Sequence, residues 1–242
     1  MSENPQTLQS WSYSRLSTFE ACKYRAKLLY LDRIPEPVRP LPPGKTEHAN
    51  DRGTRIHYAA ETYVNSNIEL IPELENFAEE FQRLKALYKE GKVSLEGEWA
   101  FDIDWMPSAW RADNTWARIK LDAFVRLSET HAVVIDYKTG RKHGNEVKHA
   151  QQGQLYQLAA FLRYPELQVI DVELWYTDQN ELSHMRFTRD QGLRFLKNFT
   201  DRGLNMTTET EFAPNPNIFS CQWCPFGPDG TGHCQRGVSR SR

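Results

Sequence analysis

The hydrophobic and polar positions of this chain follow two periods, and the change lies near residue 93. Before that residue, apolar side chains recur every three or four positions, which is the spacing of one helix face. After it, segments rich in aromatic and β-branched residues are typical of strands, and a helical period returns between them. The pattern predicts an N-terminal helical part followed by an α/β core in which a crossover helix connects strands.

Capping residues and helix breakers place the expected elements. The first helix should have Ser14 or Ser17 as its N-cap, with Glu20 completing a capping box after Ser17, and should end before Pro35. Further helices are expected over residues 51–65, 72–91, 146–164 and 189–203, and strands over residues 94–105, 115–127, 131–140, 167–177 and 181–188. We expect the first three strands to be consecutive and antiparallel.

One expected strand, VVIDYKTG at residues 133–140, carries charges inside an apolar run. Residues i and i+2 of a strand point to the same face, so Asp136 and Lys138 should emerge side by side. Burying these charges is costly unless they serve each other or a bound group. Asp122 lies sixteen residues before Lys138 on the preceding strand, and a hairpin would bring it close to Asp136.

Two neighbouring carboxylates repel each other unless a cation lies between them. Mg²⁺ and Mn²⁺ bind through one or two carboxylates and keep water molecules, so Asp122 and Asp136 are the first expected metal ligands. Lys138 could position or deprotonate an attacking water, or neutralise charge on a phosphate. A surface Asp–Lys pair at a strand end is the alternative that these residues leave open.

The composition predicts a cytoplasmic globular protein that does not enter a membrane. The chain has 242 residues, 39% of them hydrophobic and 26% charged, which is enough for one large domain. No apolar run approaches the length of a membrane span, and the N-terminal MSENPQTLQSW lacks the features of a signal peptide.

A net charge of −2 argues against a protein that coats nucleic acid by bulk positive charge. Two local groups of basic residues remain as nucleic-acid contacts or, equally, as solvated surfaces: Lys23, Arg25, Lys27 and Arg33 in the first helix, and Arg141, Lys142, His143 and Lys148 after the charged strand.

The chain's four cysteines are arranged as a metal site would require. Cys221 and Cys224 form a C-x2-C pair, Cys234 follows after nine residues, and Cys22 stands near the N-terminus. In a reducing cytoplasm this clustering favours a metal over a disulfide. The three C-terminal cysteines could bind zinc with His233 or Cys22, whereas a [4Fe–4S] cluster would require Cys22. Four unrelated buried thiols are the third possibility.

An aspartate followed on the next strand by Asp-x-Lys resembles the signature of the PD-(D/E)XK nucleases, here Asp122, Asp136 and Lys138. The segment RGTRIHYAAE resembles the Gly-x-x-x-His helix of the RecB-like branch, which implies that His57 is another metal ligand. The resemblance also implies a metal contact from the Tyr137 carbonyl.

Further motifs extend the resemblance along most of the chain. Gln152 and Tyr156 match the Gln-x-x-x-Tyr motif of the branch, and Glu98 falls where the branch often has a glutamate on the first strand. The segment ARIKL departs from relatives that often carry a glycine before Asp122. One N-terminal and three C-terminal cysteines resemble the arrangement that holds a [4Fe–4S] cluster in AddB-type nucleases and CRISPR adaptation exonucleases, although the last spacing is longer.

The resemblance implies a restriction-endonuclease-like α/β fold, a mixed central sheet flanked by helices. We expect a single domain over residues 1–242, with a helical part at 1–92, a catalytic core at 93–205 and a cysteine-rich tail at 206–242 that closes a metal cluster with Cys22. The implied location is the cytoplasm of a prokaryote or of a phage-infected host cell.

The implied activity is a Mn²⁺- or Mg²⁺-dependent exonuclease on single-stranded DNA or duplex ends, in recombination, repair or CRISPR adaptation, with a possible protein partner from such a system. A histidine ligand favours Mn²⁺. Trp110, Trp116 and Tyr156 are candidates for base stacking, with Arg111 and Arg118 near the backbone, although core packing fits each tryptophan better. The rival functions are a non-catalytic DNA-binding adaptor and a restriction-type endonuclease.

Overall fold

The computed structural model describes residues 6–239, and its chain forms two compact units. One unit is Leu41–Asn198, and the other combines Met1–Pro40 with Phe199–Arg242. Residues 1–5, which belong to the segment expected to lack a signal peptide, lie outside the described residues. The three-part division expected from the sequence stays a prediction.

The larger unit is built on a mixed six-stranded sheet with the order β2-β1-β3-β4-β5-β6. The strands are β1 (Val93–Phe101), β2 (Pro107–Ser108), β3 (Ala117–Arg126), β4 (His131–Lys138), β5 (Val169–Tyr176) and β6 (Glu181–Thr188). β4 and β5 are parallel, while every other neighbouring pair is antiparallel. This confirms the expected α/β fold and the antiparallel start of the sheet.

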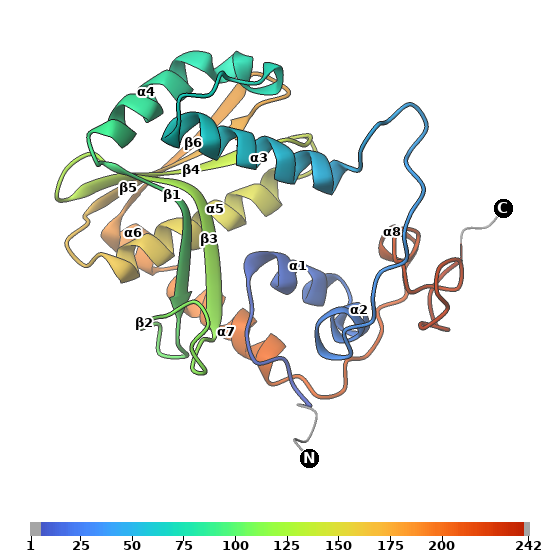
Figure 1. Ribbon diagram of the computed structural model, residues 1–242. Coiled ribbons are helices and arrows are strands. Elements are labelled where there is room, and N and C mark those ends of the chain that lie inside the picture. The colour runs from blue at the N-terminus through green and yellow to red at the C-terminus, as the bar shows by residue number, and fades with distance from the viewer. Residues whose placement is uncertain (1–5, 240–242) are drawn as a thin grey trace. The chain divides into compact units, whose positions relative to one another are not determined.

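Helices cover both faces of this sheet (Figure 1). On one face lie α3 (Ala49–Asn65), the 3₁₀ turn η2 (Pro72–Phe77) and α4 (Ala78–Lys89), which bury a core of aromatic and aliphatic side chains against β3, β4 and β5. On the other face, α5 (Glu146–Arg163) makes the crossover between the parallel strands, and α6 (Arg189–Leu193) follows β6. Burial of the apolar stripe of each helix is the main stabilising term for such layers.

The ladder between β3 and β4 ends where charges begin. Its last registered pair is Ala123 with Ile135, both within the apolar core. Asp122 and Asp136 occupy the next register position on their strands. The pairing therefore stops at the first position that would place two carboxylates opposite each other.

The N-terminal helix differs from its prediction. Its N-cap is Ser12, whose Oγ accepts a hydrogen bond from Arg15, while Ser17 lies inside the helix and donates to the Tyr13 carbonyl at 2.9 Å. The capping box with Glu20 was therefore wrong. That carboxylate instead forms an ion pair with Arg202 at 2.6 Å.

This helix is also shorter than expected, because Cys22 adopts an extended conformation with φ of −162°. The chain then continues in three pieces: α1 is Tyr13–Ala21, α2 is Lys23–Ala26, and a π-helical turn η1 spans Lys27–Leu31. The smaller unit further contains most of α7 (Leu196–Thr207) and the short α8 (Ile218–Cys221). None of the helices within residues 6–239 has the length and apolar character needed to cross a bilayer.

Candidate functional site

A cleft of about 700 Å³ opens in the larger unit where β3 and β4 separate. The side chains that line it come from α3, β1, β3, β4, the turn after β4, and α5. They include every residue of the larger unit that the sequence singled out for catalysis or metal binding: His57, Asp122, Asp136, Tyr137, Lys138, Gln152 and Tyr156.

Asp122 is fixed by one partner at each carboxylate oxygen. Its Oδ1 lies 2.9 Å from Nδ1 of His57 on α3, and its Oδ2 accepts a hydrogen bond of 2.6 Å from the backbone N–H of Tyr137. The second bond takes the place of a ladder bond that β3 and β4 no longer make. The Tyr137 ring packs into the core, 5.8 Å from the His57 ring. Asp122 thus connects α3 to the end of β4.

Four further polar groups form a closed ring of contacts. Lys138 Nζ lies 2.5 Å from Oδ2 of Asp136 and donates to Oε1 of Gln152 at 2.7 Å. Nε2 of Gln152 donates to the Tyr156 hydroxyl at 2.5 Å, and that hydroxyl donates to Oδ1 of Asp136 at 3.1 Å. Because Gln152 and Tyr156 are one turn apart on α5, both reach the same strand end. Asp136 is 4% exposed, so this ring is shielded from bulk water.

Glu96 is a site residue that the sequence interpretation missed. One ligand atom each of His57, Glu96 and Asp122 lie within 4.8 Å of one another, a spacing that one metal ion could bridge. In the β1–β3 register Glu96 is opposite Asp122, and its φ of 47° is uncommon for a residue with a side chain. Such strain is found at functional sites, where the surrounding fold maintains it.

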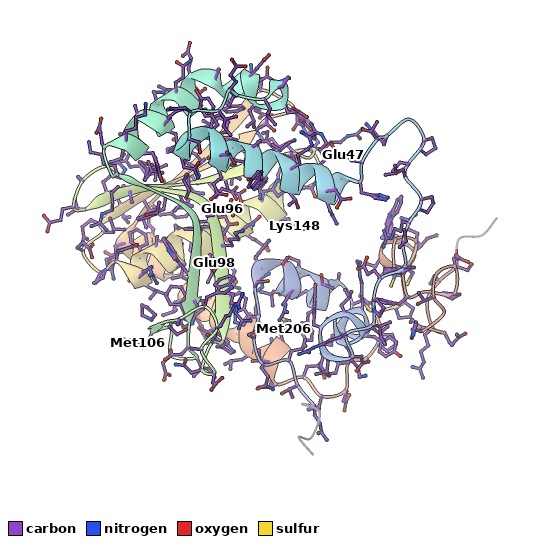
Figure 2. All side chains as sticks on the ribbon, in the orientation of Figure 1. Glu47, Glu96, Glu98, Met106, Lys148 and Met206 are labelled. Carbon is purple, nitrogen blue, oxygen red and sulfur yellow. The ribbon has the colours of Figure 1, made fainter. Side chains whose placement is uncertain are left out.

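Glu98, the glutamate suggested from the sequence, is exposed and does not line the cleft. Figure 2 shows Glu96 and Glu98 following each other along β1. Residues two apart in a regular strand share a face, so the sequence pattern alone could not choose between them. Lys120 pairs with Glu96 at 2.5 Å.

The protonation of this cleft is governed by burial and by the mutual charges of its groups. Burial lowers the pKa of His57, but the hydrogen bond and charge of Asp122 and the charge of Asp136 outweigh it, so the pKa is raised. Burial raises the pKa of Asp122 and the charge of Asp136 adds to this, against the hydrogen bond from His57. Because both pKa values are raised, His57 and Asp122 keep their protons to higher pH than usual, and a bound divalent cation would displace those protons.

The donor set fits a hard divalent cation. Oδ2 of Asp136 is buried and makes no hydrogen bond, although Lys138 Nζ lies near it. This oxygen and those of Glu96 and Asp122 are carboxylate ligands of the kind that Mg²⁺ and Mn²⁺ prefer. The imidazole nitrogen of His57 is a ligand that suits Mn²⁺.

His149 is a second residue that the sequence interpretation did not select. It lines the cleft, and its Nδ1 lies 2.9 Å from the Tyr176 hydroxyl. Burial and the charge of Lys138 lower the pKa of His149 to about 4. The imidazole is therefore neutral at physiological pH and can serve as a hydrogen-bonding group in the cleft.

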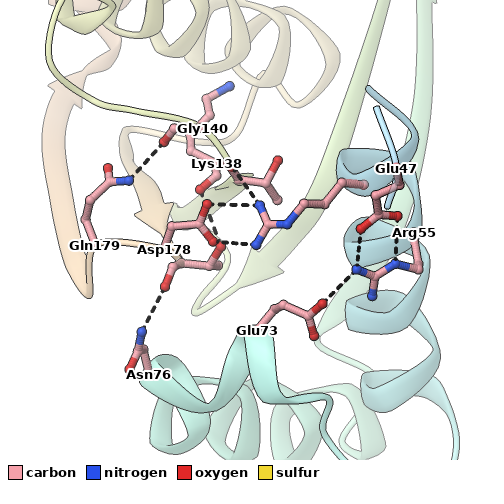
Figure 3. A network of polar contacts seen from close by, with 11 residues as sticks. Glu47, Arg55, Glu73, Asn76, Lys138, Gly140, Asp178 and Gln179 are labelled. Atoms are coloured by element: carbon pink, nitrogen blue, oxygen red, sulfur yellow. Dashed lines mark hydrogen bonds and ion pairs between the residues drawn. The ribbon is translucent and has the colours of Figure 1, made fainter. Parts of the chain in front are cut away.

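The backbone after Lys138 is anchored from two directions (Figure 3). Arg52 on α3 donates to the Thr139 carbonyl at 3.1 Å and forms two bonds to Asp178, at 2.9 and 2.8 Å. Gln179, in the turn between β5 and β6, donates to the Gly140 carbonyl at 3.3 Å. These contacts hold the end of β4 without involving the side chains of the cleft.

The two groups of basic residues have different surroundings. In the first, Lys23 pairs with Glu209, Arg25 with Glu36 and Lys27 with Asp32, which favours the interpretation as a solvated surface. In the second group, Lys142 pairs with Glu181 and His143 with Glu146, whereas Arg141 lines the cleft.

The tryptophans proposed for base stacking do not line the cleft. Trp116 is buried against Trp105, and Trp110 packs with Arg118, whose Nε donates to its carbonyl at 2.9 Å. Arg111 is exposed. Tyr156 lines the cleft, but its hydroxyl belongs to the ring of contacts with Asp136.

The four cysteines line one cavity of the smaller unit, with a volume of about 150 Å³. All are free thiols, and Cys22, Cys221 and Cys224 are partly exposed while Cys234 is buried. Among residues 6–239, no three cysteine sulfurs lie within 4.8 Å of one another.

Comparison with known proteins identifies a family for this chain. The family model described as "PD-(D/E)XK nuclease superfamily" matches residues 10–228. No curated protein matches the chain. A solved structure titled "Crystal structure of SSO0001" aligns with a TM-score of 0.45 and 13% sequence identity, over 96% of this chain and 88% of that chain.

Proposed function

The chain belongs to the PD-(D/E)XK nuclease superfamily, and from that premise we propose that it is a metal-dependent deoxyribonuclease. The observation that carries the proposal is the cleft itself, in which the two aspartates and the lysine of the signature lie together with His57 and Glu96. An exonuclease on single-stranded DNA or on duplex ends is the specific activity that we propose. Its support is the resemblance of the sequence motifs to RecB-like nucleases.

The proposed metal ligands are His57, Glu96, Asp122 and Asp136, with the Tyr137 carbonyl beside them. A bound Mn²⁺ or Mg²⁺ would activate water and offset charge on the phosphate oxygens. Burial of Asp122 and Asp136 supports this assignment, because two buried carboxylates are stable together when a cation or protons neutralise them.

Lys138 is the residue that we propose for direct contact with the phosphodiester. Its Nζ is held by Asp136 and Gln152, so little side-chain entropy remains to be lost when substrate binds. There it would stabilise negative charge as a water oxygen bonds to phosphorus and the ester P–O bond breaks. A proton from the attacking water is transferred to the departing ester oxygen. Gln152 and Tyr156 act as positioning residues, because each touches Lys138 or Asp136.

The test is digestion of end-labelled linear single-stranded DNA beside circular DNA, with Mn²⁺, by the wild type and by Lys138→Ala. We expect the wild type to degrade the linear strand and the variant to lose this activity by about a hundredfold or more. The matched control is Lys92→Ala, since Lys92 forms a surface pair with Glu90 outside the cleft. DNA binding without cleavage by both proteins would instead favour the non-catalytic adaptor.

For the smaller unit, we propose that the four cysteines hold a structural [4Fe–4S] cluster, with zinc as the alternative. The observation that supports this proposal is that all four thiols line one cavity of the smaller unit. Burial raises the pKa of the Cys224 thiol, so in the absence of metal it stays protonated. We further propose a recombination, repair or CRISPR adaptation setting, with a protein partner from that system, on the resemblance alone.

A further inference from the structure

A second cavity, which we call the flanking cavity, adjoins the catalytic cleft. It has a volume of about 620 Å³ and is formed by residues of the segment before α3, the turn after β4, and the turn between β5 and β6. Thr139, Gly140 and Arg141 line both the flanking cavity and the catalytic cleft. A molecule that occupies the cleft can therefore extend directly into the flanking cavity.

The acidic side chains of the flanking cavity are already neutralised. Asp178 receives two of the three guanidinium bonds of Arg52, and Glu47 receives two bonds from Arg55, at 2.7 and 3.2 Å (Figure 3). Arg55 also pairs with Glu73 at 2.7 Å, and its hydrogen bonds lower the pKa of both glutamates. Neither Glu47 nor Asp178 is left to neutralise another cation.

Two cations of the flanking cavity remain uncompensated. Within the part of the chain that the structure describes, neither Lys45 nor Arg141 forms an ion pair. Both side chains are exposed and can move toward a ligand. A concave surface with paired acids and two free cations attracts anions, and the attraction is strongest for phosphate groups that accept several hydrogen bonds.

We propose that the flanking cavity binds a phosphodiester of the substrate strand next to the one that is cleaved, through Lys45 and Arg141. This inference rests on the proposed nuclease function, because it places the scissile phosphate in the catalytic cleft. Arg141 stands at the boundary of the two cavities, so it would contact the strand where it leaves the cleft, and Lys45 would contact the phosphate beyond. Such contacts position the strand and do not depend on its sequence.

The test compares Lys45→Ala, Arg141→Ala and the double variant with two matched controls, Lys89→Ala and Arg194→Ala. Both control residues are exposed and line neither cavity. Binding of a fluorescent single-stranded oligonucleotide is measured by anisotropy, with Ca²⁺ replacing the reactive metal, over a range of salt concentrations. We expect weaker binding and a salt slope that falls by about 1 for each contact removed.

Turnover separates this inference from the proposed function. For the oligonucleotide, we expect the double variant to raise KM several-fold with little change in kcat. Hydrolysis of bis(p-nitrophenyl) phosphate, which has no flanking phosphate, should be unaffected in Lys45→Ala, because Lys45 lines the flanking cavity and not the catalytic cleft. Binding losses no larger than those of the controls, or a wild type that binds no oligonucleotide, would overturn the inference. If the wild type hydrolyses neither substrate but the variants still lose binding, the nuclease proposal fails and the phosphate-binding cavity stands.

Discussion

In the ring of contacts around Asp136, each polar atom of Gln152 and Tyr156 has a defined role as hydrogen-bond donor or acceptor. The amide oxygen of Gln152 faces Lys138, so its NH₂ group must face Tyr156, and the Tyr156 hydroxyl must donate to Asp136. Burial raises the pKa of Tyr156 well above its ordinary value, which keeps this hydroxyl protonated. A single proton on Tyr156 therefore sets the direction of the hydrogen bonds on that side of the ring.

Removal of this hydroxyl should slow the reaction without weakening substrate binding. We expect Tyr156→Phe to lower kcat by about tenfold to a hundredfold, because Gln152 and Asp136 lose a partner while Tyr156 itself is only 4% exposed. Single-turnover cleavage at saturating DNA measures the effect. Tyr164→Phe is the control, since the Tyr164 ring stacks on Phe124 and does not line the cleft. An unchanged kcat would remove Tyr156 from the positioning residues.

The raised pKa of His57 predicts how metal affinity depends on pH. In the metal-free protein, Asp122, Asp136 and Glu96 favour the protonated imidazole, which stabilises the fold fully below pH 6.5 and loses this effect as the pH rises through the raised value. Metal ligation requires the neutral ring. At pH values below the raised pKa of His57, we expect the Mn²⁺ dissociation constant to fall by about tenfold for each unit by which the pH increases, because binding displaces one proton.

Calorimetric titration with Mn²⁺ between pH 5.5 and 8.5 checks this dependence, with release of about one proton measured in buffers of different ionisation enthalpy. The His57→Asn variant should bind Mn²⁺ more weakly and with a shallower pH dependence. A wild-type affinity that does not change with pH would exclude His57 as a ligand. Unfolding of the metal-free wild type should show the complementary loss of stability as the pH rises.

At the level of elements, two glycines report how closely α5 packs against α6 and against the sheet. A Cβ on Gly192 of α6 would lie 2.0 Å from Oε1 of Gln157 and 2.5 Å from the Phe161 ring, both fully buried on α5. A Cβ on Gly153 of α5 would lie 2.5 Å from the terminal methyl of Met185, which can rotate away, and 3.1 Å from Cγ1 of Val172, which would have to shift by only a few tenths of an ångström. The two positions therefore look alike in sequence but differ in how their neighbours can respond.

We expect Gly192→Ala to lower the free energy of unfolding by about 1–3 kcal/mol, because Gln157 and Phe161 cannot move without opening the core. Gly153→Ala should stay within about 1 kcal/mol of the wild type, since alanine's helix propensity offsets the displacement of Met185. Urea unfolding of both variants gives the comparison. Equal losses would show that the packing of α6 on α5 is no tighter than that of α5 on the sheet.

The sequence predicted regular elements better than their interruptions. Strands and long helices follow from periodic burial, so β3, β4 and α5 were predicted to within a few residues. The two-residue strand β2 and the four-residue helix α8 are too short to show a period. The break at Cys22 lies inside an unbroken helical pattern, and only its tertiary surroundings make that residue extended.

The candidate site likewise contains residues that the sequence predicted and features that it did not. Motif spacing selected the aspartates, Lys138 and His57, because those positions have local sequence signatures. Glu96 depends on a positive φ and on its register opposite Asp122, neither of which a spacing rule contains. The flanking cavity depends on which acids are already paired, and residues such as Arg52 and Asp178 are far apart in sequence.

For the whole molecule, the cysteines predict a property of the smaller unit. We expect Cys22→Ser to lose the iron and visible absorbance of the wild type and to make residues of the smaller unit more sensitive to limited proteolysis. Mn²⁺-dependent turnover should change little, because Cys22 belongs to the other unit from the catalytic cleft.

Metal analysis, absorbance and peptide mapping give these readouts, with Ser220→Ala as the control beside Cys221. A colourless wild type with one zinc per chain would establish the zinc alternative. A Cys22→Ser protein that keeps its full iron content would show that this thiol is not a ligand.

The division of the chain between its two units also determines the order in which they can fold during synthesis. Every residue of the Leu41–Asn198 unit is synthesised before Cys221, so this unit can fold while the ribosome is still completing the chain. Cys22 is synthesised early, and roughly 200 further residues, on the order of 10–40 seconds at ordinary rates of translation, separate it from Cys221, the next cysteine that lines the cavity. Assembly of the smaller unit is therefore a late event, and the proposed metal site there would require the Cys22 thiol to remain reduced through that interval.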